Sequence, residues 1–333
     1  MNRLFTYPIA LVTALLVSAF STRAQEYRHL LRGFDDNDGI DIRGMGSDEG
    51  YTNGTRIELL YQPQKKRSLL YALLPKAGDS SITTYGWGLM QVMYTPNQLK
   101  TPFPVEGDYP YAGGLFVAHT FHSANPIKKL NLQSEIILGV MGGPSLAEGF
   151  QKFIHRTFGF ITPRGWDSQL PTDLLLNYNF TAEKQLASAG ELLDVSAGST
   201  LSAGTMQNYG HVYGLLRFGK KFSWYDGLIQ QHNQPNGAQK RWQLYGILKP
   251  GAQLVLYNAM LQGGMLNKRS PYRDKSEHPL HHVEPEKWVG RFDFGVMASS
   301  GNASVLFMQS LRTTEAVGMR PHSVGTISLQ LAW

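Results

Sequence analysis

Cysteine is absent from the 333 residues, so neither disulfides nor thiolate metal sites hold this fold together. No apolar run reaches the roughly 18 residues that a membrane-spanning helix requires. The sequence also lacks the nucleophile elbow of serine hydrolases, the HExxH zinc motif, the P-loop and the dinucleotide fingerprint. These absences exclude a disulfide-stapled domain and a helical membrane protein, and they leave the corresponding enzyme classes without support.

Charged residues are scarce, at 17%, whereas glycine (35 residues) and aromatic residues (11%) are abundant, as suits β-structure with many turns. Residues 1–24 resemble a secretory signal peptide, because Arg3 precedes a short apolar core and small residues follow near position 24. Removing this segment takes away Arg3 and Arg23 and no acidic residue, so the formal net charge falls from +6 to +4. Such a mild charge argues against a nucleic-acid partner.

Several segments of residues 25–333 alternate apolar and polar positions over about ten residues, the length of a tilted membrane-spanning strand. In one of them Trp288, Phe292 and Val296 share a face, and Arg291 and Asp293 share the other. Aromatic residues near segment ends, typical of interfacial girdles, are Tyr51, Tyr61, Tyr85, Tyr94, Trp288 and Trp333. A bilayer offers no partner for loose backbone groups, so such a sheet must close. The pattern predicts a single-domain, all-β antiparallel transmembrane barrel, with a soluble β-sandwich as the alternative.

The predicted strands number twelve. Their expected ranges are 26–35, 51–62, 82–94, 112–122, 130–141, 173–185, 191–202, 209–219, 242–262, 285–298, 303–312 and 323–333. The ninth contains Lys-Pro-Gly, so it is either two strands or one that projects beyond the membrane. With both termini in the periplasm, parity places the connections 36–50, 95–111, 142–172 and 263–284 at the cell surface.

One of these surface connections contains a predicted helix of about three turns. Ser145 and Glu148 have the spacing of a capping box, and Gly159 follows the last turn. Leu146, Phe150, Phe153 and Ile154 share one side, an apolar stripe that indicates a helix packed over another part of the protein. His155 borders this stripe and is the candidate catalytic histidine, because histidine titrates near neutrality and can accept a proton from water.

Oxygen ligands are dense at the end of the first strand, in the run Asp35, Asp36, Asn37, Asp38 and Asp41. Such ligands suit Ca²⁺, although no glutamate closes an EF-hand loop at the required distance. An acidic turn without a metal is the alternative. A second cluster, His278, His281 and His282, has the chemistry for Zn²⁺, and a solvated loop with chance histidines is its alternative.

The ordered set D-N-D, Y-T-N-G, M-Y-T-P, G-D-Y-P-Y-A-G, F-I-H-R-T-F-G and P-R-G-W-D-S-Q-L resembles the LpxR family. These are outer-membrane lipid A 3′-O-deacylases, and the resemblance covers nearly the whole mature chain. It implies a twelve-stranded monomeric barrel, embedded in the bacterial outer membrane, that acts on lipid A of lipopolysaccharide at the extracellular face. The implied mechanism is similar to that of secreted phospholipase A2, with water activated by histidine and an oxyanion stabilised by Ca²⁺, or alternatively by Zn²⁺ or another divalent cation.

Carried over by position, the resemblance makes His155 the general base, Asn37 and Asp38 the asparagine–aspartate pair, and Thr52 the hydroxyl of the second strand. Asp38 and Asp36 are the expected metal ligands. The alternative register for the pair is Asp36–Asn37. The acidic residue that a family member carries after the histidine is absent here, and Asp167 and Glu148 are the candidates to replace it.

Lys100 and Arg156 lie on surface connections, and we expect them to bind phosphates of lipid A, with simple solvation as the alternative. Two other functions remain open from the sequence. A non-catalytic barrel or narrow pore would use charges predicted to face the lumen, which are of both signs and could equally pair with one another; they are Arg56, Glu58, Glu135, Arg291 and Asp293. An outer-membrane phospholipase would differ in the headgroup of its substrate.

Overall fold

The computed structural model describes residues 26–42, 50–63, 74–103, 107–233, 242–267 and 282–333. The predicted signal peptide and two of the zinc candidates, His278 and His281, lie outside these residues. Among the residues that the structure describes, no helix has the length and apolar character needed to cross a membrane.

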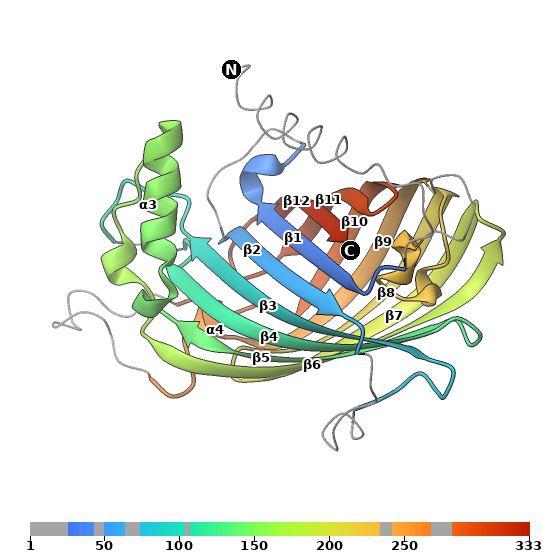
Figure 1. Cartoon of the computed structure of the whole chain (residues 1–333). Helices are drawn as coiled ribbons and strands as arrows, with labels where there is room; N and C mark the ends of the chain where they lie inside the picture. Colours follow the sequence, from blue (N-terminus) through green and yellow to red (C-terminus); the bar gives the residue numbers. More distant parts are fainter. Residues whose placement is uncertain (1–25, 43–49, 64–73, 104–106, 234–241, 268–281) are drawn as a thin grey trace.

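Twelve antiparallel strands form a closed barrel in which each strand pairs with its neighbours in sequence and β1 also pairs with β12 (Figure 1). The strands are β1 His29–Asn37, β2 Gly50–Tyr61, β3 Ile82–Thr95, β4 Ala112–Asn125, β5 Leu130–Met141, β6 Asp173–Ala189, β7 Leu193–Gly204, β8 Gln207–Lys220, β9 Trp242–Asn258, β10 Trp288–Ser300, β11 Ala303–Thr314 and β12 Pro321–Ala332. The helices are α3 Ala147–Phe158 and α4 Ala259–Gln262, with 3₁₀ turns η1 Asp38–Ile40, η2 Gly143–Ser145, η3 Trp166–Ser168, η4 Trp224–Asp226 and η5 Gln230–His232. Closure leaves none of the described strands with an unpaired edge. The predicted number and order of strands are confirmed, and the ninth is one continuous strand.

Alternation along the strands separates an apolar outside from a polar inside, as predicted. On β10, Trp288 is 68% exposed on the outer surface, whereas Asp293 is buried. On β5, Ile136 and Leu138 are exposed and Glu135 is buried. The prediction of an aromatic girdle is wrong for Tyr51 and Tyr94, which line a cavity inside the barrel.

The lumen is crossed by paired charges rather than by an open charged channel. The Arg32 guanidinium lies 2.6 Å from the Glu58 carboxylate, and Arg56 pairs with Glu58 and with Glu135. Further along, Arg291 pairs with Asp293. The predicted lumenal charges therefore face inward and neutralise one another, because a buried charge is stable only when it is paired.

The connection between β8 and β9 folds into the barrel at the end that carries the described termini. Leu228 and Ile229 of this connection form an apolar cluster with Tyr27, Leu30 and Leu60. The backbone N–H of Tyr27 also donates to the side chain of Asn233. The segment that contains η4 and η5 thus packs across this end of the lumen.

Candidate active site

The two longest connections, 142–172 and 259–287, lie at the other end of the barrel, called here the distal end, where β1 also leads through η1 toward β2 and where α3 lies (Figure 1). On the outer surface of β1 and β2, the apolar row of Leu31, Ile57 and Leu59 gives way at this end to polar residues. Asp35 accepts hydrogen bonds from the Asn53 amide (3.0 Å) and the Thr55 hydroxyl (2.9 Å). Polar groups are costly on a surface that faces lipid, so this polar patch of Asp35, Asn53 and Thr55 is a candidate functional site.

Asn37 and Asp38 border the patch at the point where β1 ends. Asn37 is paired in register with Asn53, and its side-chain oxygen caps η1 by accepting from the Gly39 N–H at 2.7 Å. Asp38 is the first residue of η1 and is buried, at 4% exposure. The cap holds Asn37 and Asp38 in one rigid turn.

Asp36 points the other way, into the lumen. Its carboxylate accepts from the hydroxyls of Thr326 (2.7 Å) and Tyr51 (3.2 Å), and it lines an internal cavity of about 320 Å³ with Arg56 and Glu58. Within the described ranges, no group of three or more histidine, aspartate or glutamate side chains is close enough to hold a metal ion. A metal at Asp38 would therefore need amide or backbone carbonyl oxygens, which Ca²⁺ accepts, to complete its ligands.

Thr52 is positioned by a bulge in β2 between Tyr51 and Asn53, the two residues on either side of it. Its hydroxyl lies 2.6 Å from that of Thr95 at the end of β3, and both side chains are buried. This bond links β2, which carries the polar patch, to β3, on which α3 rests. Thr95 belongs to the M-Y-T-P motif, but the sequence alone gave no role for it.

The helix α3 packs on the outer surface of β3 and β4, through its small and polar face. A Cβ at Gly113 of β4 would lie 2.5 Å from the Cβ of Ala147, so only glycine permits this approach. The Gln91 side chain of β3 donates to the Ser145 backbone oxygen at 2.8 Å, just before the helix. The predicted capping box is wrong: Leu146 occupies the cap position without a side-chain bond, and Glu148 pairs instead with Lys152.

Gln151 fixes the buried face of α3 to the segment that follows the helix. Its side-chain oxygen accepts from the Trp166 indole N–H at 2.8 Å, and both residues are buried. Trp166 also packs with Ala147 and Leu99 in a small apolar cluster. The motifs F-I-H-R-T-F-G and P-R-G-W-D-S-Q-L are therefore parts of one structural unit.

His155 lies on the same buried face as Ala147 and Gln151, at 6% exposure. Gly159 adopts φ 75°, which turns the chain so that the backbone oxygen of Ile161 returns to the imidazole. The Nδ1–H of His155 donates to that oxygen at 2.5 Å. Because a carbonyl can only accept, a neutral ring carries its proton on Nδ1 and its lone pair on Nε2, the arrangement of a general base.

The remaining site candidates are placed as follows. The structure brings Asn37 at the end of β1, Asp38 at the start of η1 and Thr52 on β2 to adjoining positions. It places His155 on the helix that covers β3 and β4. Lys100 and Arg156 are both exposed, Lys100 next to Leu99 of the small apolar cluster and Arg156 on α3. The metal ligands and the phosphate-binding role of these two residues stay predictions.

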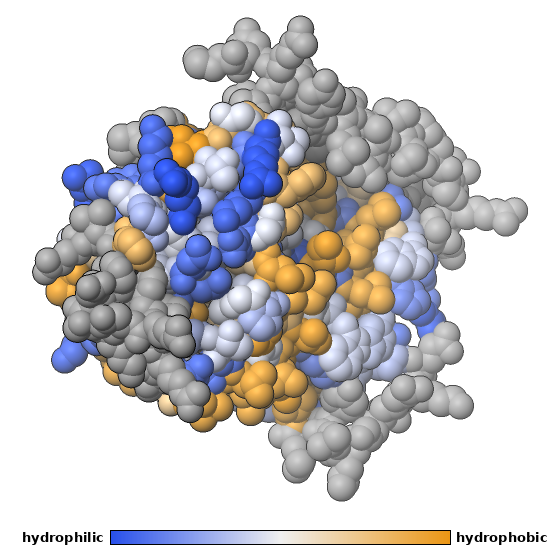
Figure 2. Space-filling model, turned by 90° about the vertical axis from the view of Figure 1, so that its left-hand side faces the viewer, coloured by the Kyte–Doolittle hydropathy of each residue, from blue (hydrophilic) through white to orange (hydrophobic). Residues whose placement is uncertain are grey.

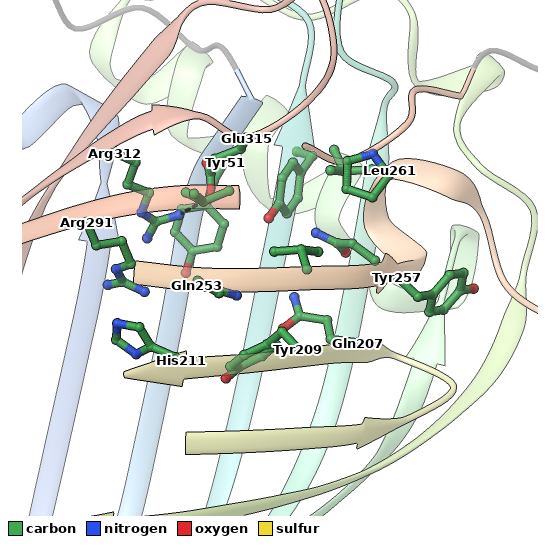
Figure 3. A pocket seen from close by; sticks show the side chains of 15 residues that line it. Tyr51, Gln207, Tyr209, His211, Gln253, Tyr257, Leu261, Arg291, Arg312 and Glu315 are labelled. Carbon is green, nitrogen blue, oxygen red and sulfur yellow. Dashed lines mark hydrogen bonds and ion pairs between the residues drawn. The ribbon is translucent and has the colours of Figure 1, made fainter. Parts of the chain in front are cut away.

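A second internal cavity, of about 190 Å³, lies in the lumen behind the polar patch. Arg291, Arg312 and His211 gather at one end of it, and Tyr257 and Leu261 lie at the other (Figure 3). Arg312 pairs with Glu315 at 2.9 Å. His155 belongs to α3, which packs on the outer surface of β3 and β4, so the candidate base and the groups that line this cavity lie on opposite sides of the barrel wall.

The sequence model of the family "Outer membrane protein LpxR" matches residues 9–333. The chain belongs to the LpxR family. LpxR-family membership and the twelve-stranded barrel make it an outer-membrane protein. The distal end lies opposite the described termini and carries the two longest connections, so we take it as the extracellular end.

Similarity to solved structures agrees with this assignment. LpxR from Salmonella typhimurium superposes with a TM-score of 0.70 at 15% sequence identity, covering 91% of this chain and 100% of that one. The β domain of the Bordetella autotransporter BrkA covers 93% and 100% at 10% identity, with a TM-score of only 0.43. No curated protein matches the chain. At these identities the likeness to solved structures shows the fold alone.

Proposed function

We propose that this LpxR-family protein is an esterase that removes the 3′-acyloxyacyl group of lipid A in the outer leaflet. The observation that carries the proposal is His155: it is buried on the face of α3 that also holds Ala147 and Gln151, and its Nδ1–H donates to the Ile161 carbonyl. A base on the outer wall can reach an ester of a lipid that stays in the membrane, whereas a base in the lumen cannot.

In the proposed reaction Nε2 of His155 takes a proton from a water molecule as its oxygen attacks the ester carbonyl. The tetrahedral intermediate then collapses, the C–O bond to the sugar breaks, and the imidazolium returns the proton to the leaving alkoxide. The products are a free fatty acid and a lipid A hydroxyl, so one water is consumed and no co-reactant is required. The Ile161 carbonyl fixes the tautomer and stabilises the imidazolium that forms.

Asn37, Asp38 and Thr52 are the polar groups that we propose for the same site. Asp38 is the proposed Ca²⁺ ligand, with oxygens of the capped turn completing the set, and bound Ca²⁺ would supply positive charge for the oxyanion. For Asp36 to serve as a second ligand, its carboxylate would have to exchange the hydrogen bonds from Tyr51 and Thr326. Lys100 and Arg156 are the proposed partners of the lipid A phosphates.

The test incubates the purified barrel in detergent with hexa-acylated lipid A, in Ca²⁺ or in EDTA, and follows the products by mass spectrometry. Wild type in Ca²⁺ is expected to lose the 3′ acyloxyacyl mass, and both EDTA and His155→Gln are expected to abolish this loss. His211→Gln is the matched control, because this histidine lines the lumenal cavity and should leave activity unchanged.

Intact lipid A with wild type in Ca²⁺, beside a folded barrel, would reject the proposal in favour of a non-catalytic barrel. Loss of activity in His211→Gln but not in His155→Gln would move the site to the lumen. A parallel incubation with glycerophospholipid separates the proposed activity from that of a phospholipase, since only the latter releases fatty acid from it.

A further inference from the structure

The helix α3 presents its apolar stripe outward instead of packing it against the barrel. Leu146 is 66% exposed and Phe153 is 63% exposed, and Phe150 is also exposed. The buried positions are Ala147, Gln151 and His155, a set of small and polar side chains. A sequence-based expectation that the stripe packs on the protein is therefore wrong, and the stripe is left without a protein partner among the described residues.

The side chains of α3 divide into three faces around its axis. With about 100° between successive residues, the buried face is centred on Gln151 and the charged face on Lys152, with Glu148 and Arg156 beside it. The apolar face of Phe150, Phe153 and Ile154, continued by Leu146, fills most of the remaining arc. Three separate faces indicate three separate surroundings: protein, polar headgroup and a third that is apolar.

The position of α3 on the barrel identifies the third surrounding. The helix is attached to the outer surface of β3 and β4, whose outward side chains Trp87, Leu89 and Val117 are exposed toward lipid. It runs across the extracellular ends of these strands rather than along them (Figure 1). The stripe therefore continues the lipid-facing surface of the barrel.

The segment after the helix extends this apolar surface. Phe158, Phe160 and Ile161 are each about half exposed, and the rings of Phe158 and Phe160 stack. Figure 2, which views the end of the molecule that carries α3, shows a hydrophobic band beside a hydrophilic area. An exposed apolar face bordered by lysine and arginine is the pattern of a helix that lies in a membrane interface.

We propose that α3 is an interfacial helix: its Leu146–Phe150–Phe153 face is immersed in the hydrocarbon of the outer leaflet. Lys152 and Arg156 then lie at the level of the lipid headgroups, whose phosphates they can pair with. The bilayer thereby holds the helix, and His155 with it, against the barrel wall. This inference concerns the placement of the helix and stands whether or not the protein hydrolyses lipid A.

The absence of cysteine makes a direct test possible with single nitroxide labels on the full chain. Phe153→Cys and Phe150→Cys report on the apolar face, Lys152→Cys on the charged face, and Leu138→Cys on the lipid-facing surface of β5. Each labelled barrel is refolded into phosphatidylcholine vesicles. Electron paramagnetic resonance then measures collision with oxygen, which concentrates in lipid, and with a water-soluble nickel chelate.

The labels at 153 and 150 are expected to match the label at 138, with an oxygen-to-nickel collision ratio several-fold above that at 152. A ratio at 153 equal to that at 152 would place the face in water and overturn the proposal. Protection of 153 from both reagents would mean that protein, such as a second copy of the chain, covers the face. That outcome also overturns the proposal. Each of these two outcomes is measured on folded protein.

Discussion

The hydroxyls of Thr52 and Thr95 lie 2.6 Å apart, buried between the extracellular ends of β2 and β3. Thr52 also lies within 3.3 Å of the Gly50 backbone oxygen, so its hydroxyl has two partners at the bulge. This pair connects the strand that carries the polar patch to the strand on which α3 rests. It gives Thr52 a structural partner as well as its proposed catalytic role, and the two can be separated.

The first prediction separates the structural role of Thr52 from its proposed catalytic role. Each of two variants removes the Thr52–Thr95 hydrogen bond, one from either side. Thr52→Val should lower stability by about 1–3 kcal/mol, because it removes the 2.6 Å partner of the buried Thr95 hydroxyl. Thr95→Val should cost less, because the Thr52 hydroxyl keeps its bond to the Gly50 backbone oxygen. If Thr52 also contacts the reacting groups, Thr52→Val should lower kcat on lipid A at least about tenfold more than Thr95→Val. Thr52→Ser should restore activity. Equal kcat values for the two valine variants would reduce Thr52 to a positioning residue.

A second prediction concerns the close approach of α3 to the barrel. The Cβ of Gly113→Ala would lie 2.5 Å from the Cβ of Ala147 and closer still to the Ser145 hydroxyl, so the helix must shift. A displacement of about 1 Å is expected to lower the deacylation rate about 10²-fold while the barrel stays folded. Folding is checked by the heat-dependent mobility of the barrel in gel electrophoresis.

Gly149 is the matched control on the helix itself. A Cβ at Gly149 meets nothing within 4 Å, so Gly149→Ala should retain activity and stabilise the helix by about 1 kcal/mol. Full activity in Gly113→Ala would show that the contact of α3 with β4 does not position the base.

A third prediction compares a buried ion pair with a partly exposed one. Arg217 and Asp194 form two hydrogen bonds, of 3.0 and 2.6 Å, with both side chains almost fully buried. Asp194→Asn leaves this arginine without its charge partner and should lower the free energy of unfolding by about 3–5 kcal/mol. Urea unfolding of the barrel in lipid vesicles measures this change in the free energy of unfolding.

The comparison for that experiment is Glu148→Gln, which removes the partly exposed pair with Lys152 on α3. An exposed i, i+4 pair contributes only about 0.3–0.5 kcal/mol, so this variant should unfold almost as wild type does. A similar loss of stability in both variants would contradict the proposed difference in burial.

The fourth prediction tests whether the β8–β9 connection closes one end of the lumen and whether that closure depends on pH. Burial lowers the pKa of the His232 imidazole from its ordinary value of 6.5, outweighing its hydrogen bond to the Gly301 backbone, which raises it. The folded β8–β9 connection thus favours neutral His232, and the contribution of this histidine to the stability of the connection is fully present above pH 6.5. That stability is lost as the pH falls below 6.5, because the unfolded segment binds the proton first.

Planar bilayers should therefore show no conductance for wild type at pH 7.5 and increasing openings at pH 5. His232→Gln, which cannot titrate, should show the same conductance at both values. Steady openings of wild type at pH 7.5 would instead support the narrow-pore function. A pH response that persists in His232→Gln would assign the titration to another group.

Much of this protein could be predicted from the sequence, because a membrane strand carries its own periodic pattern. Alternation placed Trp288 outward and Asp293 inward, and the number of strands fixed closure and the side of each connection. Glycine at position 159 correctly ended the helix, since a left-handed residue there favours glycine. These features depend on neighbours within a few residues, or on a rule that every membrane barrel obeys.

The tertiary structure decided what depends on distant residues. Periodicity showed that α3 has an apolar stripe, but only the glycine at position 113 determines that the opposite face meets the barrel. Asp36 and Asp38 are two residues apart in sequence, yet one faces the lumen and the other enters the turn after β1. The lone pair on Nε2 of His155 likewise follows from a carbonyl six residues later, which a turn returns to the ring. Local pattern determines which elements form, whereas the faces they present are set by contacts that form only when the barrel closes.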